Sequence, residues 1–145
     1  MGEARLLSRA VLLTQIGSMS QQPLPLAGCR ILVVEDEPLL ADHVADTLER
    51  AGARIVGPYS SIVEALDNLD QLSALDGAVL DIGLGEETSF PLADALQTTR
   101  LPFVFVTGQE KRTLPSAFSG AAHLLKPFQE EELIATLIRI GVVAQ

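Results

Sequence analysis

From residue 30 onward, short apolar runs alternate with segments in which apolar residues recur every three or four positions. Buried strands of a parallel sheet read as short apolar runs, whereas amphipathic helices read as a 3.6-residue period. The runs predict five strands, at residues 31–34, 54–56, 78–80, 103–106 and around 124–125. The helical periods predict helices at residues 38–51, 61–69, 91–99 and 130–142.

The ends of these helices carry the residues that helix ends favour. Pro38 suits a first helical position, Gly52 suits a helix end, and Ser60 or Ser61 can cap the second helix. The residues expected to face inward are Leu40, Val44, Leu48 and Ala51 in the first helix, Ile62, either Ala65 or Leu66, and Leu69 in the second, and Leu133, Leu137 and Ile140 in the last.

The order of elements predicts an α/β fold of the (βα)₅ type. Strictly alternating strands and helices imply right-handed crossovers and a parallel sheet covered by helices on both faces, which makes a three-layer sandwich. The fourth repeat differs, because Pro115 and Gly120 leave only residues 112–118 for a helix. We therefore expect a short or irregular fourth helix.

Residues 1–28 differ from the rest and are interpreted as an N-terminal extension, followed by a domain at residues 29–145. Residues 3–16 favour a short amphipathic helix, and residues 17–28 resemble a linker. Such a helix needs a packing partner, which a second chain in a homodimer could supply. Met19 offers a second start, so the sequence leaves open whether residues 1–18 are translated. As a secretion signal the segment is weak, because Glu3 lies where basic residues are expected. The apolar residues of the helix are Leu6, Leu7, Ala10, Val11, Leu13 and Ile16.

Composition narrows the classes of function. A chain of 145 residues fits one domain, and no apolar run approaches the roughly 20 residues of a membrane-spanning helix. The net charge of −9 argues against a nucleic-acid partner. The single cysteine, Cys29, can form neither an internal disulfide nor a thiolate zinc site, so we expect a cytoplasmic protein.

Chemically distinctive residues follow four of the five predicted strands. Glu35 and Asp36 follow the first, Asp81 the third, Thr107 the fourth and Lys126 the fifth. Each alone could be a helix-capping, turn or surface residue. Because ligands of open α/β sheets collect at the carboxyl ends of the strands, we expect the five side chains to share one site.

Electrostatics limits what such a site can hold. Two carboxylates about 4 Å apart repel by roughly 4 kcal/mol at an effective dielectric near 20, so three need a proton or a cation. Mg²⁺ takes oxygen ligands and leaves positions for phosphate oxygens. Asp81 could then attack phosphorus as a nucleophile, with Thr107 and Lys126 holding the other phosphoryl oxygens.

Four segments resemble the signature regions of response-regulator receiver domains: "ILVVEDEP" (31–38), "AVLDIGLG" (78–85), "FVFVTG" (103–108) and "HLLKPF" (123–128). The resemblance covers residues 30–142 and implies a flavodoxin-like sheet of order 2-1-3-4-5, an order that receivers exemplify. The form "PFVFVTG" is similar to the FATGUY subgroup of single-domain receivers.

The resemblance also implies a role for each site residue. Asp81 corresponds to the phospho-acceptor, and a sensor histidine kinase or a histidine phosphotransfer protein to its donor. The implied Mg²⁺ ligands are Asp36, Asp81, the Gly83 carbonyl and Glu35, the last through water. Thr107 and Lys126 correspond to the residues that sense the phosphoryl group.

Some positions depart from the family pattern. Glu35 stands where the family often has Asp, and Gly85 where many members have Pro. His123 occupies the position of an aromatic switch residue that couples to Thr107. The spacing of 19 residues between Thr107 and Lys126, 126 − 107, is short for the family.

The function predicted from these residues is that of a phospho-acceptor in a two-component system or phosphorelay. Because Gln145 comes directly after the last helix, we expect a stand-alone, non-enzymatic receiver whose output passes through a downstream protein partner. The alternatives are a phosphatase-like hydrolase, a flavin-binding electron carrier and a degenerate receiver that only binds. Gly83 stands where a hydrolase would carry a second acid, and the acidic loop after the first strand disfavours a flavin phosphate.

Overall fold

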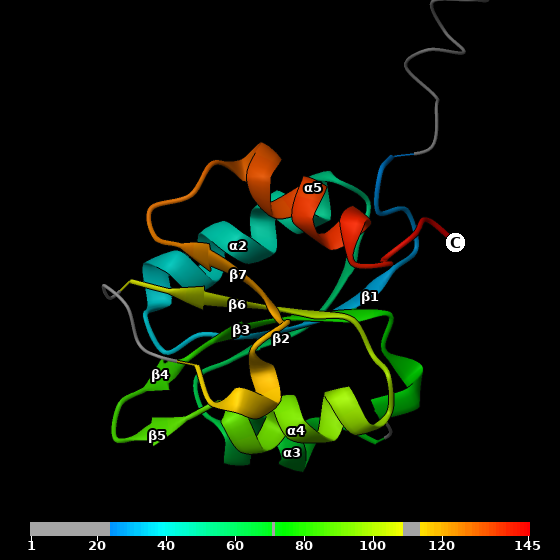
Figure 1. Cartoon of the computed structure of the whole chain (residues 1–145). Coiled ribbons are helices and arrows are strands. Elements are labelled where there is room, and N and C mark those ends of the chain that lie inside the picture. Colours follow the sequence, from blue (N-terminus) through cyan, green and yellow to red (C-terminus); the bar gives the residue numbers. More distant parts are fainter. Residues whose placement is uncertain (1–23, 71, 109–113) are drawn as a thin grey trace, which may run out of the picture.

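The computed structural model describes residues 24–70, 72–108 and 114–145. Its main sheet is parallel and has the order β2-β1-β3-β6-β7. Counted along the chain, these five strands have the predicted order 2-1-3-4-5. The strands are β1 (Arg30–Val34), β2 (Arg54–Tyr59), β3 (Gly77–Asp81), β6 (Phe103–Thr107) and β7 (Ala122–Leu125). The helices are α2 (Pro38–Arg50), α3 (Ile62–Asn68), α4 (Phe90–Thr98) and α5 (Glu130–Arg139). Helices α2 and α5 cover one face of the sheet, and α3 and α4 cover the other (Figure 1).

Two apolar cores result from the alternation of side chains along the strands. Ile31 and Val33 of β1 point to the core shared with α2 and α5, whereas Leu32 and Val34 point to the core shared with α3 and α4. Successive strand residues face opposite sides of a sheet, so a strand covered on both faces must be apolar throughout. The three-layer prediction is therefore confirmed.

The second core is rich in aromatic rings. Phe105 of β6 lies edge-on to Phe90 and Phe118, with ring centroids 5.7 and 5.5 Å apart. Phe118 ends a single 3-10 turn, Ser116–Phe118, which is the only helical element in the described part of the fourth repeat (residues 114–121). The expectation of a short fourth helix is met there, while residues 109–113 of that repeat lie outside the described residues.

Several element boundaries differ from prediction. Strand β2 runs on to Tyr59, because Gly57, at φ +104°, and Pro58 form an irregularity in the ladder, after which Tyr59 pairs with Val34 of β1. Helix α5 ends at Arg139, followed by Gly141 at φ +113°. In α3 Ile62 and Ala65 are buried and Leu66 is exposed, which decides between the two inward residues that the sequence left open. The antiparallel hairpin of β4 (Gly83–Leu84) and β5 (Glu87–Thr88) has no signal in the sequence, since each strand has only two residues.

The two ends of the described chain meet at the pole opposite the carboxyl ends of the strands. The Leu26 amide donates to the Ala51 carbonyl at 2.8 Å, and the Gln145 amide donates to the Ala27 carbonyl at 2.8 Å. Leu26 is fully buried in the core of α2 and α5. Residues 24–28, assigned by sequence to the linker, thus pack on the domain, and the division at residue 28 stays a prediction.

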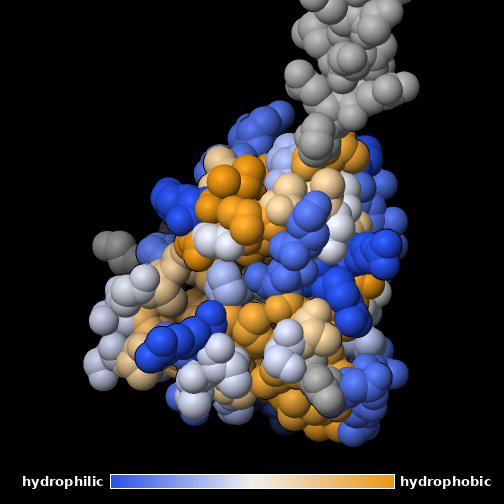
Figure 2. All heavy atoms as spheres, turned by 90° about the vertical axis from the view of Figure 1, so that its right-hand side faces the viewer, coloured by the Kyte–Doolittle hydropathy of each residue, from blue (hydrophilic) through white to orange (hydrophobic). Residues whose placement is uncertain are grey.

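The surface at this pole mixes hydrophilic and hydrophobic residues (Figure 2). Hydrophobic residues reach the surface there in patches that lie between hydrophilic ones. None of the helices among residues 24–70, 72–108 and 114–145 is both long and apolar enough to cross a membrane.

We predict that Leu26→Ala lowers the free energy of unfolding by about 2–5 kcal/mol, because it removes a buried leucine side chain from a packed core. Leu24→Ala is the matched control, since Leu24 is 48% exposed, and it should cost less than about 0.5 kcal/mol. Urea unfolding of both variants measures the difference. A loss of less than about 0.5 kcal/mol in Leu26→Ala as well would show that residues 24–28 are not part of the core.

Candidate functional site

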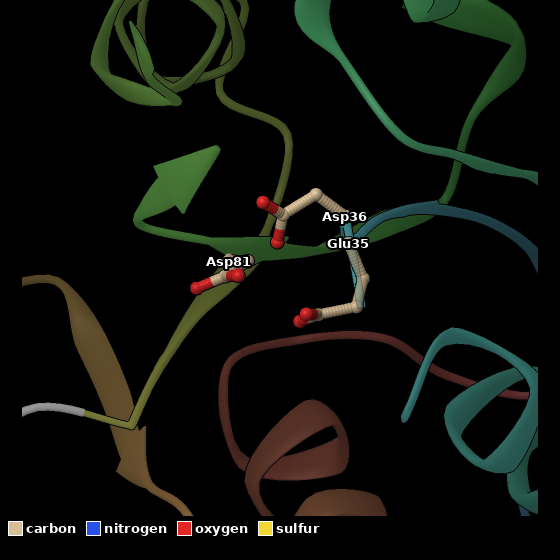
Figure 3. Close-up of side chains that lie close together, drawn as sticks. All are labelled: Glu35, Asp36 and Asp81. Carbon is tan, nitrogen blue, oxygen red and sulfur yellow. The ribbon is translucent and has the colours of Figure 1, made fainter. Parts of the chain in front are cut away.

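The acidic residues lie where β1 and β3 end. Glu35 and Asp36 directly follow β1, and Asp81 is the last residue of β3, its neighbour in the sheet. One carboxylate oxygen from each of Glu35, Asp36 and Asp81 lies within 4.8 Å of the others. Figure 3 shows the three side chains gathered around the ends of the two strands. The sequence prediction that these three residues come together is confirmed.

The three carboxylates differ in exposure. Glu35 and Asp81 are buried, whereas Asp36 is exposed. The backbone amide of Glu35 donates to the Tyr59 carbonyl of β2 at 2.9 Å. The Glu37 amide, at the start of α2, donates to Glu35 Oε1 at 3.1 Å. Glu35 is thus held at both its backbone and its side chain.

Lys126 brings a positive charge to the two buried carboxylates. Its Nζ donates to Glu35 Oε2 at 3.1 Å and to Oε1 at 3.3 Å, and it forms an ion pair with Asp81 Oδ2 at 3.4 Å. The Lys126 amide donates to the Thr107 carbonyl at 2.7 Å, which ties the lysine to the end of β6. Because Lys126 follows β7, four neighbouring strands of the sheet, β1, β3, β6 and β7, contribute to the site.

Asp81 has the most perturbed acidity in the site. Burial, and secondarily the Glu35 carboxylate, raise the pKa of Asp81 from 3.8 to about 7, although Lys126 opposes the shift. The Lys126 ammonium therefore does not offset the combined effect of burial and of the Glu35 carboxylate. A divalent cation would supply the missing charge, and three carboxylates match the oxygen ligands that Mg²⁺ prefers. The residues present thus fit such an ion.

Three predicted site residues remain, and each lies on a different strand: Thr107 on β6, Gly83 on β4 and His123 on β7. Thr107 ends β6, next to β3 and β7, and is partly buried. Gly83 lies two residues after Asp81 in the β4–β5 hairpin, which the sequence did not predict. The His123 side chain is exposed on β7, where its strand partner is Phe105.

Comparison with known proteins gives a consistent result. Residues 31–138 match the family described as response regulator receiver domain. The sensory transduction protein LytT of Bacillus cereus is 36% identical over 113 residues, which cover 74% of this chain and 45% of that protein. The chain spans about half the length of the curated relatives it matches.

Two solved structures show the same fold at comparable identity. The non-phosphorylated receiver domain of HemR from Leptospira biflexa has a TM-score of 0.67 and 32% identity, covering 81% of this chain and 97% of that one. The solution structure of SdrG from Sphingomonas melonis has a TM-score of 0.67 and 36% identity, covering 78% and 96%. Sequence, sheet order and structural similarity agree, and this chain belongs to the response regulator receiver domain family of two-component signal transduction.

Proposed function

We propose that this receiver takes a phosphoryl group onto Asp81 from a sensor histidine kinase or a histidine phosphotransfer protein. The observation that carries the proposal is the position of the Asp81 carboxylate, within 4.8 Å of two other acids and 3.4 Å from the Lys126 ammonium. A buried carboxylate beside both a cation site and an ammonium suits nucleophilic attack on a charged phosphoryl group.

In the proposed step, an Asp81 carboxylate oxygen forms a bond to phosphorus. The bond between phosphorus and the donor imidazole nitrogen breaks, and the imidazole leaves with the electron pair. Lys126 neutralises one phosphoryl oxygen, and the Thr107 hydroxyl donates to another. A bound Mg²⁺ would supply positive charge to the phosphoryl oxygens. Asp36, Asp81 and the Gly83 carbonyl would hold the ion, with Glu35 acting through water.

Output and location belong to the same proposal. The protein acts on no substrate other than its own phospho-aspartate, and its signal passes to a downstream protein through altered contacts in the cytoplasm. The coupling between Thr107 and the switch residue is proposed to differ from that of the family, because His123, an exposed imidazole on β7, stands where a larger aromatic ring would be expected. Assembly as a homodimer through residues 3–16 is also proposed, and these residues lie outside the described ones.

We predict that Asp81→Asn abolishes acid-labile phosphorylation, because an amide cannot serve as the nucleophile. The purified protein would be incubated with Mg²⁺ and acetyl phosphate, and the gain of one phosphoryl group would be followed by intact mass. Asp67→Asn, on the exposed side of α3, is the control that should retain the modification. Unchanged phosphorylation of the Asp81→Asn variant would refute the assignment.

We predict that Asp36→Asn removes the Mg²⁺ site, since Asp36 is the exposed acid of the cluster and Lys126 pairs with the other two. In the unmodified protein, Mg²⁺ at about 100 times its dissociation constant should stabilise the fold by about 2.7 kcal/mol. Thermal unfolding across a Mg²⁺ titration measures this gain. Asp42→Asn, exposed on α2, should keep the full gain, and a full gain in Asp36→Asn would place the ion elsewhere.

We predict that, without metal, the contribution of Asp81 to the free energy of unfolding falls as the pH rises from about 4 to above 7. The pKa of Asp81 is raised from 3.8 to about 7 in the fold, so the folded state binds more protons than the unfolded state in this range. Asp81→Asn should therefore be more stable than the unmodified protein at pH 8 by about 1–4 kcal/mol and similar at pH 4. Urea unfolding with a chelator tests this, and a difference independent of pH would contradict it.

A further inference from the structure

Glu35 is oriented by contacts that do not involve a metal ion. Its backbone is fixed to β2 through Tyr59, and its Oε1 atom accepts from the Glu37 amide at 3.1 Å. The side chain is 5% exposed, so it is enclosed by the ends of the strands rather than turned toward solvent. A buried carboxylate of this kind has little freedom to move toward another ligand without losing these contacts.

Both oxygens of Glu35 accept from the same lysine. The Lys126 Nζ lies 3.1 and 3.3 Å from them, closer than its 3.4 Å to Asp81 Oδ2. The lysine side chain is 16% exposed, and its stem has four rotatable carbons. Because such a flexible side chain adopts many rotamers, a defined ammonium position needs a partner that fixes it.

We propose that Glu35 is a positioning residue for Lys126. It holds the ammonium beside the Asp81 carboxylate, where a phosphoryl oxygen must be neutralised, and it prevents the ammonium from pairing with Asp81 alone. This inference rests on the proposed phosphorylation of Asp81. It assigns Glu35 a task distinct from that of Asp36, the exposed acid of the cluster, although both follow the same strand.

Loss of the Glu35 charge should change the partner of the lysine. A glutamine at this position has one acceptor oxygen and no charge, so Lys126 would pair mainly with Asp81. That pairing would cover the nucleophile with an ammonium and leave no cation placed for the incoming phosphoryl oxygen. In Glu35→Asp the side chain is one methylene group shorter. The negative charge remains, but the carboxylate does not reach the position it has in glutamate.

The test separates the rate of phosphorylation from the affinity for Mg²⁺. At saturating Mg²⁺ and acetyl phosphate, Glu35→Gln should phosphorylate Asp81 about tenfold more slowly, and Glu35→Asp should recover part of the rate. Because Glu35 is also proposed to reach the ion through water, Glu35→Gln should weaken Mg²⁺ binding by about tenfold, in contrast to the loss of binding in Asp36→Asn, and for this reason the rates are compared at saturating Mg²⁺. Glu37→Gln removes a neighbouring exposed acid and should leave the rate and the Mg²⁺ affinity unchanged.

A double-mutant cycle with Lys126→Met tests whether Glu35 acts through the lysine. Lys126→Met alone should slow phosphorylation by about 10²-fold, and adding Glu35→Gln should slow it no further. Without metal or phosphoryl donor, Lys126→Met should shift the thermal midpoint less in the Glu35→Gln background than in the unmodified one. This second measurement does not depend on phosphorylation.

The possible results are distinct. Independent effects of Glu35→Gln and Lys126→Met, on the rate or on the metal-free midpoint, would overturn the positioning role. So would a Glu35→Gln variant with weakened Mg²⁺ binding and an unchanged rate at saturation, because Glu35 would then serve the metal alone. If the unmodified protein is not phosphorylated on Asp81, the proposed function itself fails, while the metal-free cycle still reports on the contact between Glu35 and Lys126.

Discussion

The arrangement of the site is governed by the burial of two carboxylates, Glu35 and Asp81, at the ends of two neighbouring strands. Glu35, Asp36 and Asp81 present oxygens within 4.8 Å of one another, and two of the three residues are buried. The Lys126 ammonium approaches them, and the pKa of Asp81 still rises to about 7 because of burial and of Glu35. Without metal, the site therefore favours the protonated form of Asp81, and a divalent cation would replace that proton and keep the carboxylate ionised.

The fold tolerates this cost because stabilising contacts are concentrated elsewhere. Both faces of the sheet are covered by helices, and the aromatic rings around Phe105 fill the layer under α4. At the opposite pole, Leu26 and the backbone bond between Gln145 and Ala27 tie both ends of the described chain to the domain. The packing of the rest of the domain therefore offsets the free-energy cost of burying Glu35 and Asp81 close together at the carboxyl ends of the strands.

Much of this could be predicted from the sequence, because apolar periodicity and strand ends are local signals. The predicted strand ends correctly placed Asp36, Asp81 and Lys126 together at the carboxyl ends of the strands. The sequence could not show that Gly57 and Pro58 extend β2, since both residues usually end an element and here the neighbouring strand decides. It could not show that Leu26 is buried, because a short Pro-containing stretch carries no periodicity. Nor could it show that Glu35 pairs with Lys126, since a contact between side chains 91 residues apart has no local pattern.

The carboxylates, the cation and the phosphoryl group are proposed to share one site at Asp81. A crystal structure of the protein with Mn²⁺ in place of Mg²⁺ and with beryllofluoride as the phosphoryl mimic tests this directly. We expect one anomalous peak between Asp36 and Asp81, beryllium bonded to an Asp81 carboxylate oxygen, and fluorines in contact with Thr107 and Lys126. Beryllofluoride on another side chain, or a Mn²⁺ ion bound without Asp36 and Asp81, would contradict the shared site.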